Sequence, residues 1–312
     1  MTALPRLVVV LGPTGSGKSA LGIRLAHELD GEVLVCDSTQ VYRGFDIGTA
    51  KVLPPEQHGV PHHLVDLADA QEIFTAGDYR RAALDLLADL RRRNKLPILT
   101  AGTGLYMRAL LEGLADAPTR SQALRERLAQ RQVTKSPGHL HRLLARLDRD
   151  SAQRIAPADI PKLIRAIEVC LLTGKTLTQI HQRGRDKLEG FEVVRIGLSP
   201  TRAELYARLD ARVTAMLNAG WLDEVRRHIE RGGPATAKPF QFIGYSQLRA
   251  HQEGRATLAD AIKEIQQATR RYAKRQMTWF HREKDVQWFN GFGDDPKIAA
   301  QALQILKPAR NS

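Results

Sequence analysis

The sequence predicts an α/β fold, in which a doubly wound parallel sheet carries an inserted all-helical domain. Three observations predict it. Short apolar runs alternate with helical segments over the first third of the chain, and a glycine-rich turn follows the first run. A basic stretch with helical spacing and little strand character then interrupts the pattern before a further strand. We therefore expect a core domain of residues 1–118 and 193–312 and a helical insertion of residues 119–192.

Four short apolar runs carry the strand prediction. They are rich in β-branched residues, as strands buried on both faces of a sheet are. We expect strands over residues 7–11, 32–36, 96–100 and 193–198. Apolar residues that recur at helical spacing predict helices over residues 19–26, 76–93, 205–228 and 258–281.

The turn after the first strand matches G-x-x-x-x-G-K-[ST], the P-loop motif, and lies between a strand and a helix as that motif requires. Its backbone N–H groups and the helix N-terminus favour phosphate, the lysine adds a positive charge, and the Ser19 hydroxyl suits Mg²⁺. This motif makes the predicted core P-loop NTPase-like. The residues expected to bind phosphate are Gly12, Pro13, Thr14, Gly15, Ser16, Gly17, Lys18 and Ser19.

A dinucleotide fingerprint is the competing interpretation of this turn, because Gly15, Gly17 and Ala20 followed by Asp37 imitate one. The lysine at position 18 argues against it, since a lysine suits free phosphoryl charge and dinucleotide sites do not require it. The motif itself does not say whether the ligand is a nucleoside triphosphate or a small diphosphate.

Two further turns fall at the carboxyl edge of the predicted sheet, where ligands bind in open α/β folds. Asp37 follows the second strand and is a candidate general base or Mg²⁺ ligand through water, or else a turn or N-cap residue. Thr103 follows the third strand and is a candidate hydrogen-bonding group in a turn whose glycines permit close approach of a ligand. We interpret the adjacent His62 and His63 as structural, because neighbouring strand residues point to opposite faces.

Composition points to a polyanionic partner. The net charge is +13, and residues 269–282 mix cations with aromatic side chains at helical spacing, which is typical of RNA contact but also of a helix with a solvated basic face. The two cysteines, Cys36 and Cys170, indicate neither a disulfide framework nor a zinc site, so a cytoplasmic setting is expected. No apolar run is long enough to span a membrane, and we expect a monomer.

Several motifs together resemble one family, the tRNA dimethylallyltransferases, also called tRNA isopentenyltransferases. The resemblance covers nearly the whole chain, and the Asp46–Lys51 and Lys274–Trp279 stretches are its most specific parts. The motifs are residues 12–19, 37–44, 46–51, 60–64, 102–106, 165–169, 243–245 and 273–279.

The resemblance implies a reaction. The P-loop would bind the diphosphate of dimethylallyl diphosphate with Mg²⁺ as cofactor, without consuming ATP. The dimethylallyl group would pass to N6 of adenosine at tRNA position 37, beside the anticodon, and diphosphate would leave. By the same resemblance Asp37 would be the general base on N6, and Thr103 and Arg208 would lie in the reaction channel.

The resemblance also implies that the helical insertion clasps the tRNA anticodon stem-loop and that the target base is flipped into the channel. The sequence departs from the family's usual residues at Thr39, Pro161, Lys162, Gln241 and Ser246. These departures affect individual tRNA contacts and not the phosphate or base chemistry. The implied tRNA-binding residues are Asp37, Ser38, Thr39, Gln40, Thr103, Arg125, Pro161, Lys162, Leu163, Ile164, Arg165, Gln241, Phe242, Ile243, Gly244, Tyr245, Ser246, Lys274, Arg275, Gln276, Met277, Thr278, Trp279, Phe280 and His281.

Two alternatives remain at this point. A P-loop kinase of a small metabolite would need nucleotide-binding and lid arginines, and it would have no use for the basic aromatic helix near the C-terminus. An RNA-binding NTPase would place an aspartate at the end of an apolar strand beside the P-loop, and the sequence offers no convincing strand of that kind.

Overall fold

A computed structural model describes residues 4–115, 117–118, 120–182 and 186–307. The chain divides into two compact units, one of residues 1–110 and 189–312 and the other of residues 111–188. The second unit contains most of the predicted insertion, residues 119–192, of which 119 and 183–185 lie outside the described residues.

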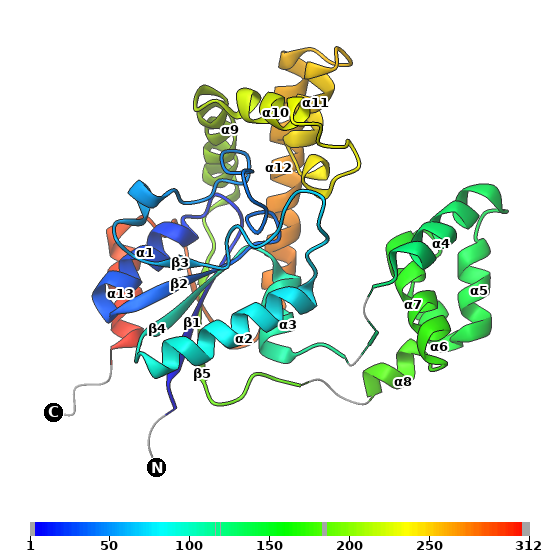
Figure 1. The fold of residues 1–312 in the computed structure, drawn as a ribbon. Helices are drawn as coiled ribbons and strands as arrows, with labels where there is room; N and C mark the ends of the chain where they lie inside the picture. The colour runs from blue at the N-terminus through cyan, green and yellow to red at the C-terminus, as the bar shows by residue number, and fades with distance from the viewer. Residues whose placement is uncertain (1–3, 116, 119, 183–185, 308–312) are drawn as a thin grey trace. The chain divides into compact units, whose positions relative to one another are not determined.

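The first unit contains a six-stranded parallel sheet (Figure 1), so the predicted fold class is confirmed. The strand order is β3-β2-β4-β1-β5-β6, and β1 pairs with β4 on one side and with β5 on the other. The four predicted strands are present within one residue at each end. The strands are β1 (Arg6–Leu11), β2 (Gly31–Cys36), β3 (His62–His63), β4 (Leu96–Ala101), β5 (Glu192–Leu198) and β6 (Val286–Phe289).

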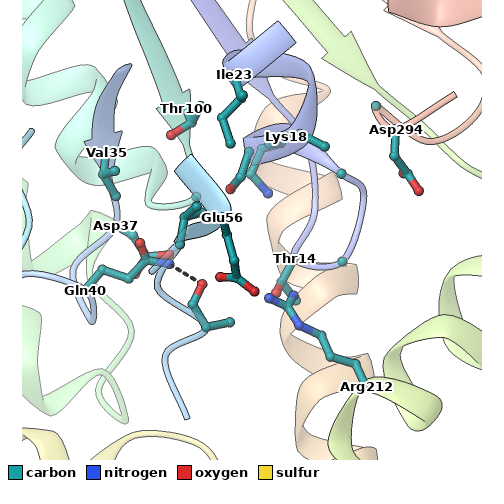
Figure 2. Close-up of a pocket in the computed structure, with 18 of the residues that line it drawn as sticks. Thr14, Lys18, Ile23, Val35, Asp37, Gln40, Glu56, Thr100, Arg212 and Asp294 are labelled. Carbon is teal, nitrogen blue, oxygen red and sulfur yellow. Dashed lines mark hydrogen bonds between the residues drawn. The ribbon is translucent and has the colours of Figure 1, made fainter. Parts of the chain in front are cut away.

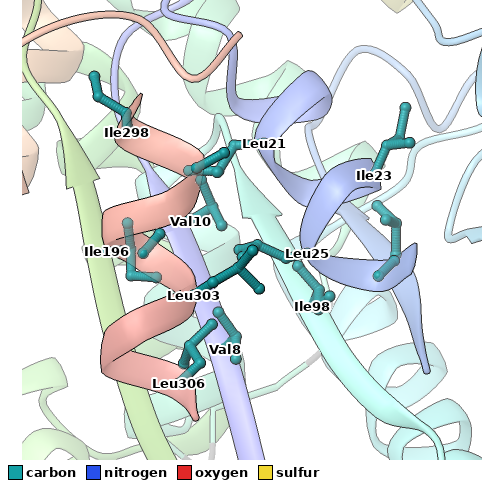
Figure 3. Close-up of a cluster of buried hydrophobic side chains, with 14 of the residues drawn as sticks. Val8, Val10, Leu21, Ile23, Leu25, Ile98, Ile196, Ile298, Leu303 and Leu306 are labelled. Atoms are coloured by element: carbon teal, nitrogen blue, oxygen red, sulfur yellow. The ribbon is translucent and has the colours of Figure 1, made fainter. Parts of the chain in front are cut away.

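Helices cover both faces of this sheet because successive strand residues point to opposite sides. Val8 and Val10 face α1 (Lys18–Leu29) and α13 (Pro296–Leu306), and Figure 3 shows Leu21 and Leu303 of these helices in the same buried cluster. On the opposite face lies α2 (Ala76–Arg92), whose buried Tyr79 donates a hydrogen bond from its hydroxyl to the carbonyl of Val35 at 3.2 Å. The core therefore fixes the start of α1, and with it the phosphate loop, at the carboxyl edge of the sheet.

The described residues of the first unit contain five further helices, of which α3 and α11 were not predicted and one predicted helix is divided in two. Residues 205–228 were expected to form one helix but belong to two, because Gly220 adopts a left-handed conformation (φ 96°) that ends the first and begins the second. The predicted helix 258–281 is present as α12. These helices are α3 (Gly104–Glu112), α9 (Arg202–Asn218), α10 (Trp221–Glu230), α11 (Tyr245–Gln252) and α12 (Leu258–Phe280), with short 3₁₀ turns at Pro54–Gln57 and Lys238–Gln241.

The second unit is helical throughout its described secondary structure, as the prediction of an all-helical insertion required. Its own apolar core joins Leu128, Leu140, Leu144 and Leu163, which come from three different helices. Its helices are α4 (Gln122–Thr134), α5 (His139–Leu147), α6 (Arg149–Arg154), α7 (Ile160–Thr173) and α8 (Leu177–Gln182). Among the described residues of both units, no helix has the length and apolar character needed to cross a membrane.

Candidate active site

The phosphate loop leaves β1 and enters α1, and all eight residues expected to bind phosphate lie in it. Gly15 (φ 78°) and Gly17 (φ 85°) both adopt left-handed conformations, which allow the loop to curl so that backbone N–H groups converge. Lys18 and Ser19 are the first residues of α1, so their N–H groups have no partner within the helix. The Lys18 ammonium donates to the carbonyl of Pro13 at 2.8 Å and so folds back over the loop.

This loop opens into a cavity of about 1150 Å³ at the carboxyl edge of the sheet. Figure 2 shows Lys18, Asp37 and Gln40 around the cavity, with Arg212 on the far side. The lining also includes Ser19 and Arg208. The structure therefore brings the phosphate loop, the acid after β2 and the predicted channel arginine to one place.

Three cations, Lys18, Arg208 and Arg212, influence one another in this cavity, whose lining also includes the acids Asp37, Glu56 and Asp294. Burial lowers the pKa of Lys18 from 10.5 to about 8, with the charge of Asp37 acting in the opposite direction and that of Arg212 in the same direction. Burial also lowers the pKa of Arg212, and the neighbouring charge of Arg208 lowers it further. An anion bound among these three cations would relieve both effects. Arg212 was not predicted as a site residue, although it lies one helical turn after Arg208 on α9.

Arg208 is oriented by residues from the C-terminal part of the chain. Its Nη1 donates to Oδ1 of Asp294 at 2.8 Å, and its guanidinium lies over the ring of Phe292, 4.6 Å from the centroid. Asp294 in turn lies against the phosphate loop, because a Cβ atom built on Gly17 would be 2.7 Å from the carboxylate. Arg208 is thus held at the loop rather than being free in solvent.

Asp37 has two differently used carboxylate oxygens. Oδ1 accepts hydrogen bonds from the backbone N–H of Thr39 at 2.9 Å and from its hydroxyl at 2.7 Å, which is the turn role considered above. Oδ2 points at Gly102, where a Cβ atom would lie only 2.7 Å away. None of the described residues donates a hydrogen bond to Oδ2, so this oxygen can accept a proton from a substrate. Turn formation and base chemistry are compatible in one side chain.

Thr103 connects the ends of β2 and β4. Its backbone N–H donates to the carbonyl of Cys36 at 2.9 Å, and its hydroxyl oxygen accepts from the N–H of Ser38 at 2.9 Å and donates to the Ser38 hydroxyl at 3.2 Å. These bonds hold the loop that begins at Asp37. Burial raises the pKa of Tyr272, and the charge of Asp37 raises it further, so this phenol stays neutral.

Gln276 has a position that the sequence did not reveal. It was expected among the tRNA contacts, but its side chain is buried, with 6% exposed. Its Oε1 accepts from the N–H of Thr14 at 2.8 Å, and its Nε2 donates to the carbonyl of Gly102 at 2.7 Å. One side chain of α12 therefore joins the phosphate loop to the turn after β4.

The other predicted tRNA-binding residues divide by exposure. Lys274, Arg275, Thr278 and His281 form the exposed part of the α12 segment, and Trp279 is 37% exposed. The exposed or half-buried positions elsewhere are Ser38, Thr39, Gln40, Thr103, Arg125, Pro161, Lys162, Arg165, Gln241, Phe242, Ile243 and Ser246, with Met277 in the α12 segment. The buried positions are Leu163, Ile164, Gly244, Tyr245, Gln276 and Phe280, of which Gln276 also lines the cavity.

Trp279 is placed against the turn after β4. A Cβ atom built on Gly104 would lie 2.2 Å from its Nε1, and the guanidinium of Arg108 lies over its ring, 4.8 Å from the centroid. The aromatic face that the sequence suggested for base stacking is thus already covered in part by an arginine.

In the second unit, Arg125 and Arg165 are both bound to one buried carboxylate. Nε and Nη2 of Arg125 donate to Glu168 at 2.9 and 2.7 Å, and Nη1 of Arg165 donates to it at 2.7 Å. These two predicted tRNA contacts therefore lie side by side and are held in fixed orientations.

The donor set for a metal ion fits Mg²⁺ held largely by substrate. Mg²⁺ takes oxygen ligands and usually combines one or two protein oxygens with phosphates and water. The Ser19 side chain lines the cavity that also contains Asp37. In the part of the chain that the structure describes, no cluster of three His, Cys, Asp or Glu residues could hold a metal ion by itself. His62 and His63 instead bond to the Val60 carbonyl and the Glu32 carboxylate.

Comparisons with known proteins identify the family to which the chain belongs. The sequence model of the family described as IPP transferase matches residues 40–283. A tRNA dimethylallyltransferase of Solibacter usitatus is 50% identical over 95% of this chain and 96% of its own, and one of Koribacter versatilis is 48% identical over 97% and 98%.

Solved structures show the same similarity. The tRNA isopentenylpyrophosphate transferase of Bacillus halodurans aligns with a TM-score of 0.71 at 35% identity, covering 96% of this chain and 95% of that one. A eukaryotic dimethylallyltransferase, described as acting on tRNA, aligns with a TM-score of 0.82 at 26% identity, covering 99% of this chain and 81% of that one. The chain therefore belongs to the tRNA dimethylallyltransferase family.

Proposed function

We propose that this protein transfers a dimethylallyl group from dimethylallyl diphosphate to N6 of adenosine at position 37 of tRNA. One observation carries the proposal: a phosphate cradle and a carboxylate oxygen without a hydrogen-bond donor among the described residues lie in one cavity, in a chain related to enzymes named for this reaction. The cradle suits the departing diphosphate, and the carboxylate suits the proton of the acceptor amine.

The diphosphate would bind to the N–H groups of the phosphate loop and to Lys18, Arg208 and Arg212. On binding, the Lys18 ammonium would exchange its bond to the Pro13 carbonyl for one to a phosphate oxygen. Ser19 would hold Mg²⁺, which adds charge that stabilises the diphosphate as it leaves. These cations act where negative charge grows, so they favour the transition state over the bound substrate.

In the transfer, the bond between C1 of the dimethylallyl group and the bridging oxygen breaks, and its electron pair leaves with diphosphate. The N6 lone pair forms the new bond to C1, and Oδ2 of Asp37 takes the N6 proton. The bonds from Thr39 to Oδ1 of Asp37 keep the carboxylate from turning away. An adenine inside a base stack cannot reach this cavity, so the base must be flipped out.

The exposed cations of α12 and the paired arginines of the insertion support RNA as the partner, and membership of the family makes the anticodon stem-loop the part of it that we propose. Lys274 and Arg275 would contact phosphates from α12, while Arg125 and Arg165 would do so from the second unit. Contacts of this kind position the RNA, whereas access of the flipped base to the cavity selects the adenosine.

The test is mass spectrometry of nucleosides from unmodified tRNA incubated with the protein, Mg²⁺ and dimethylallyl diphosphate in the absence of ATP. We expect one dimethylallyl group on the adenosine beside the anticodon, and none with the Lys18→Met variant. Folded wild-type protein that gives no prenylated nucleoside would refute the proposal. Transfer of label from γ-labelled ATP to a small molecule would then indicate a kinase, and RNA-stimulated phosphate release an NTPase.

A further inference from the structure

The Asp46–Lys51 motif has no part in the chemistry described so far, yet it borders the cavity. Thr49 and Ala50 line the cavity, and so does Gln40. The Gln40 side-chain amide donates to the carbonyls of Thr49 at 3.0 Å and Ala50 at 3.3 Å, and Figure 2 includes this side chain with a dashed hydrogen bond. We refer to residues 40–51 as the wall segment, because they form the side of the cavity that contains these groups.

The wall segment is bound from behind by one buried carboxylate of α10. Glu224 is 3% exposed. It accepts hydrogen bonds from the backbone N–H groups of Asp46 at 2.9 Å, Ile47 at 2.8 Å and Gly48 at 3.3 Å, and from the hydroxyl of Tyr245 at 2.5 Å. Three consecutive N–H groups directed at one anion form a concave backbone site, and here the anion belongs to the protein itself.

Packing makes this attachment close and specific. A Cβ atom built on Gly48 would lie 2.0 Å from Nε1 of Trp221 and 2.5 Å from the ring of Tyr245, so only glycine fits there. Phe45 stacks on the ring of His228 with 3.9 Å between centroids. The backbone of the wall segment therefore rests directly on α10 and α11.

The far end of the wall segment is fixed by a second buried charge. The Lys51 ammonium donates to the carbonyl of Tyr42 at 2.6 Å and to the carboxylates of Asp46 at 2.7 Å and Asp66 at 2.6 Å. Lys51 joins two points of the segment to each other and to Asp66, whereas Glu224 attaches the segment to the α10–α11 pair. The His228 ring of α10 adds one hydrogen bond from Nε2 to the carbonyl of Gly44 at 2.7 Å. Among the described contacts, Glu224 thus accepts three of the backbone hydrogen bonds that attach the wall segment to the α10–α11 pair.

We propose that Glu224 is a positioning residue for the transfer reaction, and that it sets the distance between the wall segment and the phosphate loop. The proposal rests on the proposed function for its catalytic consequence. Transfer requires N6 of the adenosine and C1 of the dimethylallyl group to approach each other in line with the bond that breaks. A shift of the wall segment by a fraction of an ångström therefore lowers turnover. Binding of diphosphate alone requires only the loop and its cations, so it tolerates the same movement.

The test compares Glu224→Gln with the wild type in three measurements: kcat for prenyl transfer, Kd for inorganic diphosphate, and hydrogen exchange of the amides of residues 46–48. Glutamine has the same shape but directs an NH₂ group at donors, so it cannot accept all four hydrogen bonds. We expect kcat to fall about 10- to 100-fold, Kd to change less than about threefold, and amide exchange to accelerate at least about tenfold.

Glu32→Gln is the matched control. Glu32 is also buried, at 5% exposed, but its partners His63 and Arg93 lie outside the wall segment and do not line the cavity. We expect its kcat to stay within about threefold of the wild type. An equal loss of kcat in both variants would show a general stability effect and overturn the proposal, as would faster exchange at residues 46–48 in Glu224→Gln with kcat unchanged.

Tyr245→Phe provides a milder second variant in case Glu224→Gln does not fold. It removes one of the four donors and leaves the three backbone bonds, so kcat should fall several-fold with diphosphate binding unchanged. Unchanged kcat in a Tyr245→Phe variant whose residues 46–48 exchange faster would overturn the proposal. Wild-type transfer is measured in the same series, so absence of prenyl transfer by the wild type would show that the proposed function has failed. The hydrogen-exchange data would still show whether Glu224 holds the wall segment.

Discussion

Replacing Glu168 by glutamine should loosen the helical unit at one defined place. The Glu168 carboxylate is fully buried and accepts hydrogen bonds from the N–H of Ser121 and from the guanidinium groups of Arg125 and Arg165. Burial alone would raise the pKa of Glu168, but the hydrogen bonds from Arg125, Arg165 and Ser121 outweigh it and lower this pKa from 4.5 to about 2. Glutamine removes the charge that both arginines require.

The size of the effect follows from that pKa. A carboxyl group that titrates at 4.5 when unfolded and at about 2 when folded stabilises the folded state by about 3 kcal/mol at neutral pH. The loss of one partner from a buried ion pair gives a similar figure, about 3–5 kcal/mol. Because the folded pKa is the lower one, this stabilisation is complete above pH 4.5 and is lost as the pH falls towards 2.

Hydrogen exchange measured by mass spectrometry is the appropriate assay. The three tryptophans, at positions 221, 279 and 288, all lie outside residues 111–188, so tryptophan fluorescence would not report on this unit. At neutral pH, 3 kcal/mol corresponds to exchange about 100-fold faster in α4 and α7 of Glu168→Gln. Glu126→Gln, an exposed change on α4, is the control and should have no effect.

Two results would refute the reasoning about Glu168. One is hydrogen exchange in α4 and α7 of the variant that stays within about threefold of the wild-type rate at neutral pH. This result would mean that the Glu168 carboxylate contributes little to the stability of the helical unit. The other is a difference between variant and wild type that does not narrow as the pH is lowered below 4.5, since the wild-type advantage depends on the ionised form.

Three further predictions concern the active site. Asp37→Asn should lower kcat at least about 100-fold with tRNA affinity unchanged, because the amide can still form the turn but cannot take a proton; near-normal turnover would exclude the base role. Gln276→Leu should destabilise the protein by about 2–4 kcal/mol, because two buried backbone groups lose their partner, and it should raise KM for dimethylallyl diphosphate. Thermal unfolding measures the stability and steady-state kinetics measure KM, with Gln267→Leu on the exposed side of the same helix as the control. Equal effects of the two substitutions would contradict the prediction. Lys18→Met should abolish diphosphate binding detectable by calorimetry, while tRNA binding in filter assays persists. If the variant kept its affinity for diphosphate, Lys18 would not be part of the phosphate-binding site.

The sheet could be predicted where burial left a continuous apolar run. The strand of residues 7–11 is of this kind, since both of its faces are covered by helices. The strands β3 and β6 were not predicted, because β3 has only two residues and β6 is a four-residue edge strand that includes Gln287. The break at Gly220 was missed because glycine within a helical pattern is also tolerated inside helices, and only the neighbouring structure decides.

The site could be predicted where its chemistry is local in sequence. The phosphate loop is eight consecutive residues, and Asp37 directly follows a strand, so motif and strand order sufficed. Gln276 and Glu224 act on segments more than 150 residues away, and nothing in their own sequence surroundings marks that contact. The tRNA-binding role of the paired arginines was inferred from the resemblance, and their shared partner Glu168 emerged only from the packing of α4 against α7.

The double hydrogen bond of Gln276 limits how this sequence can diverge. The side chain at position 276 must accept a hydrogen bond from one backbone N–H and donate one to a backbone carbonyl. It must also be as long as that of glutamine to reach both groups. Glutamate lacks the donor, lysine lacks the acceptor, and asparagine is too short. Over evolutionary time, therefore, Lys274 and Arg275 on the exposed side of α12 can exchange with other cations as the RNA surface changes, while glutamine at position 276 has no equivalent replacement.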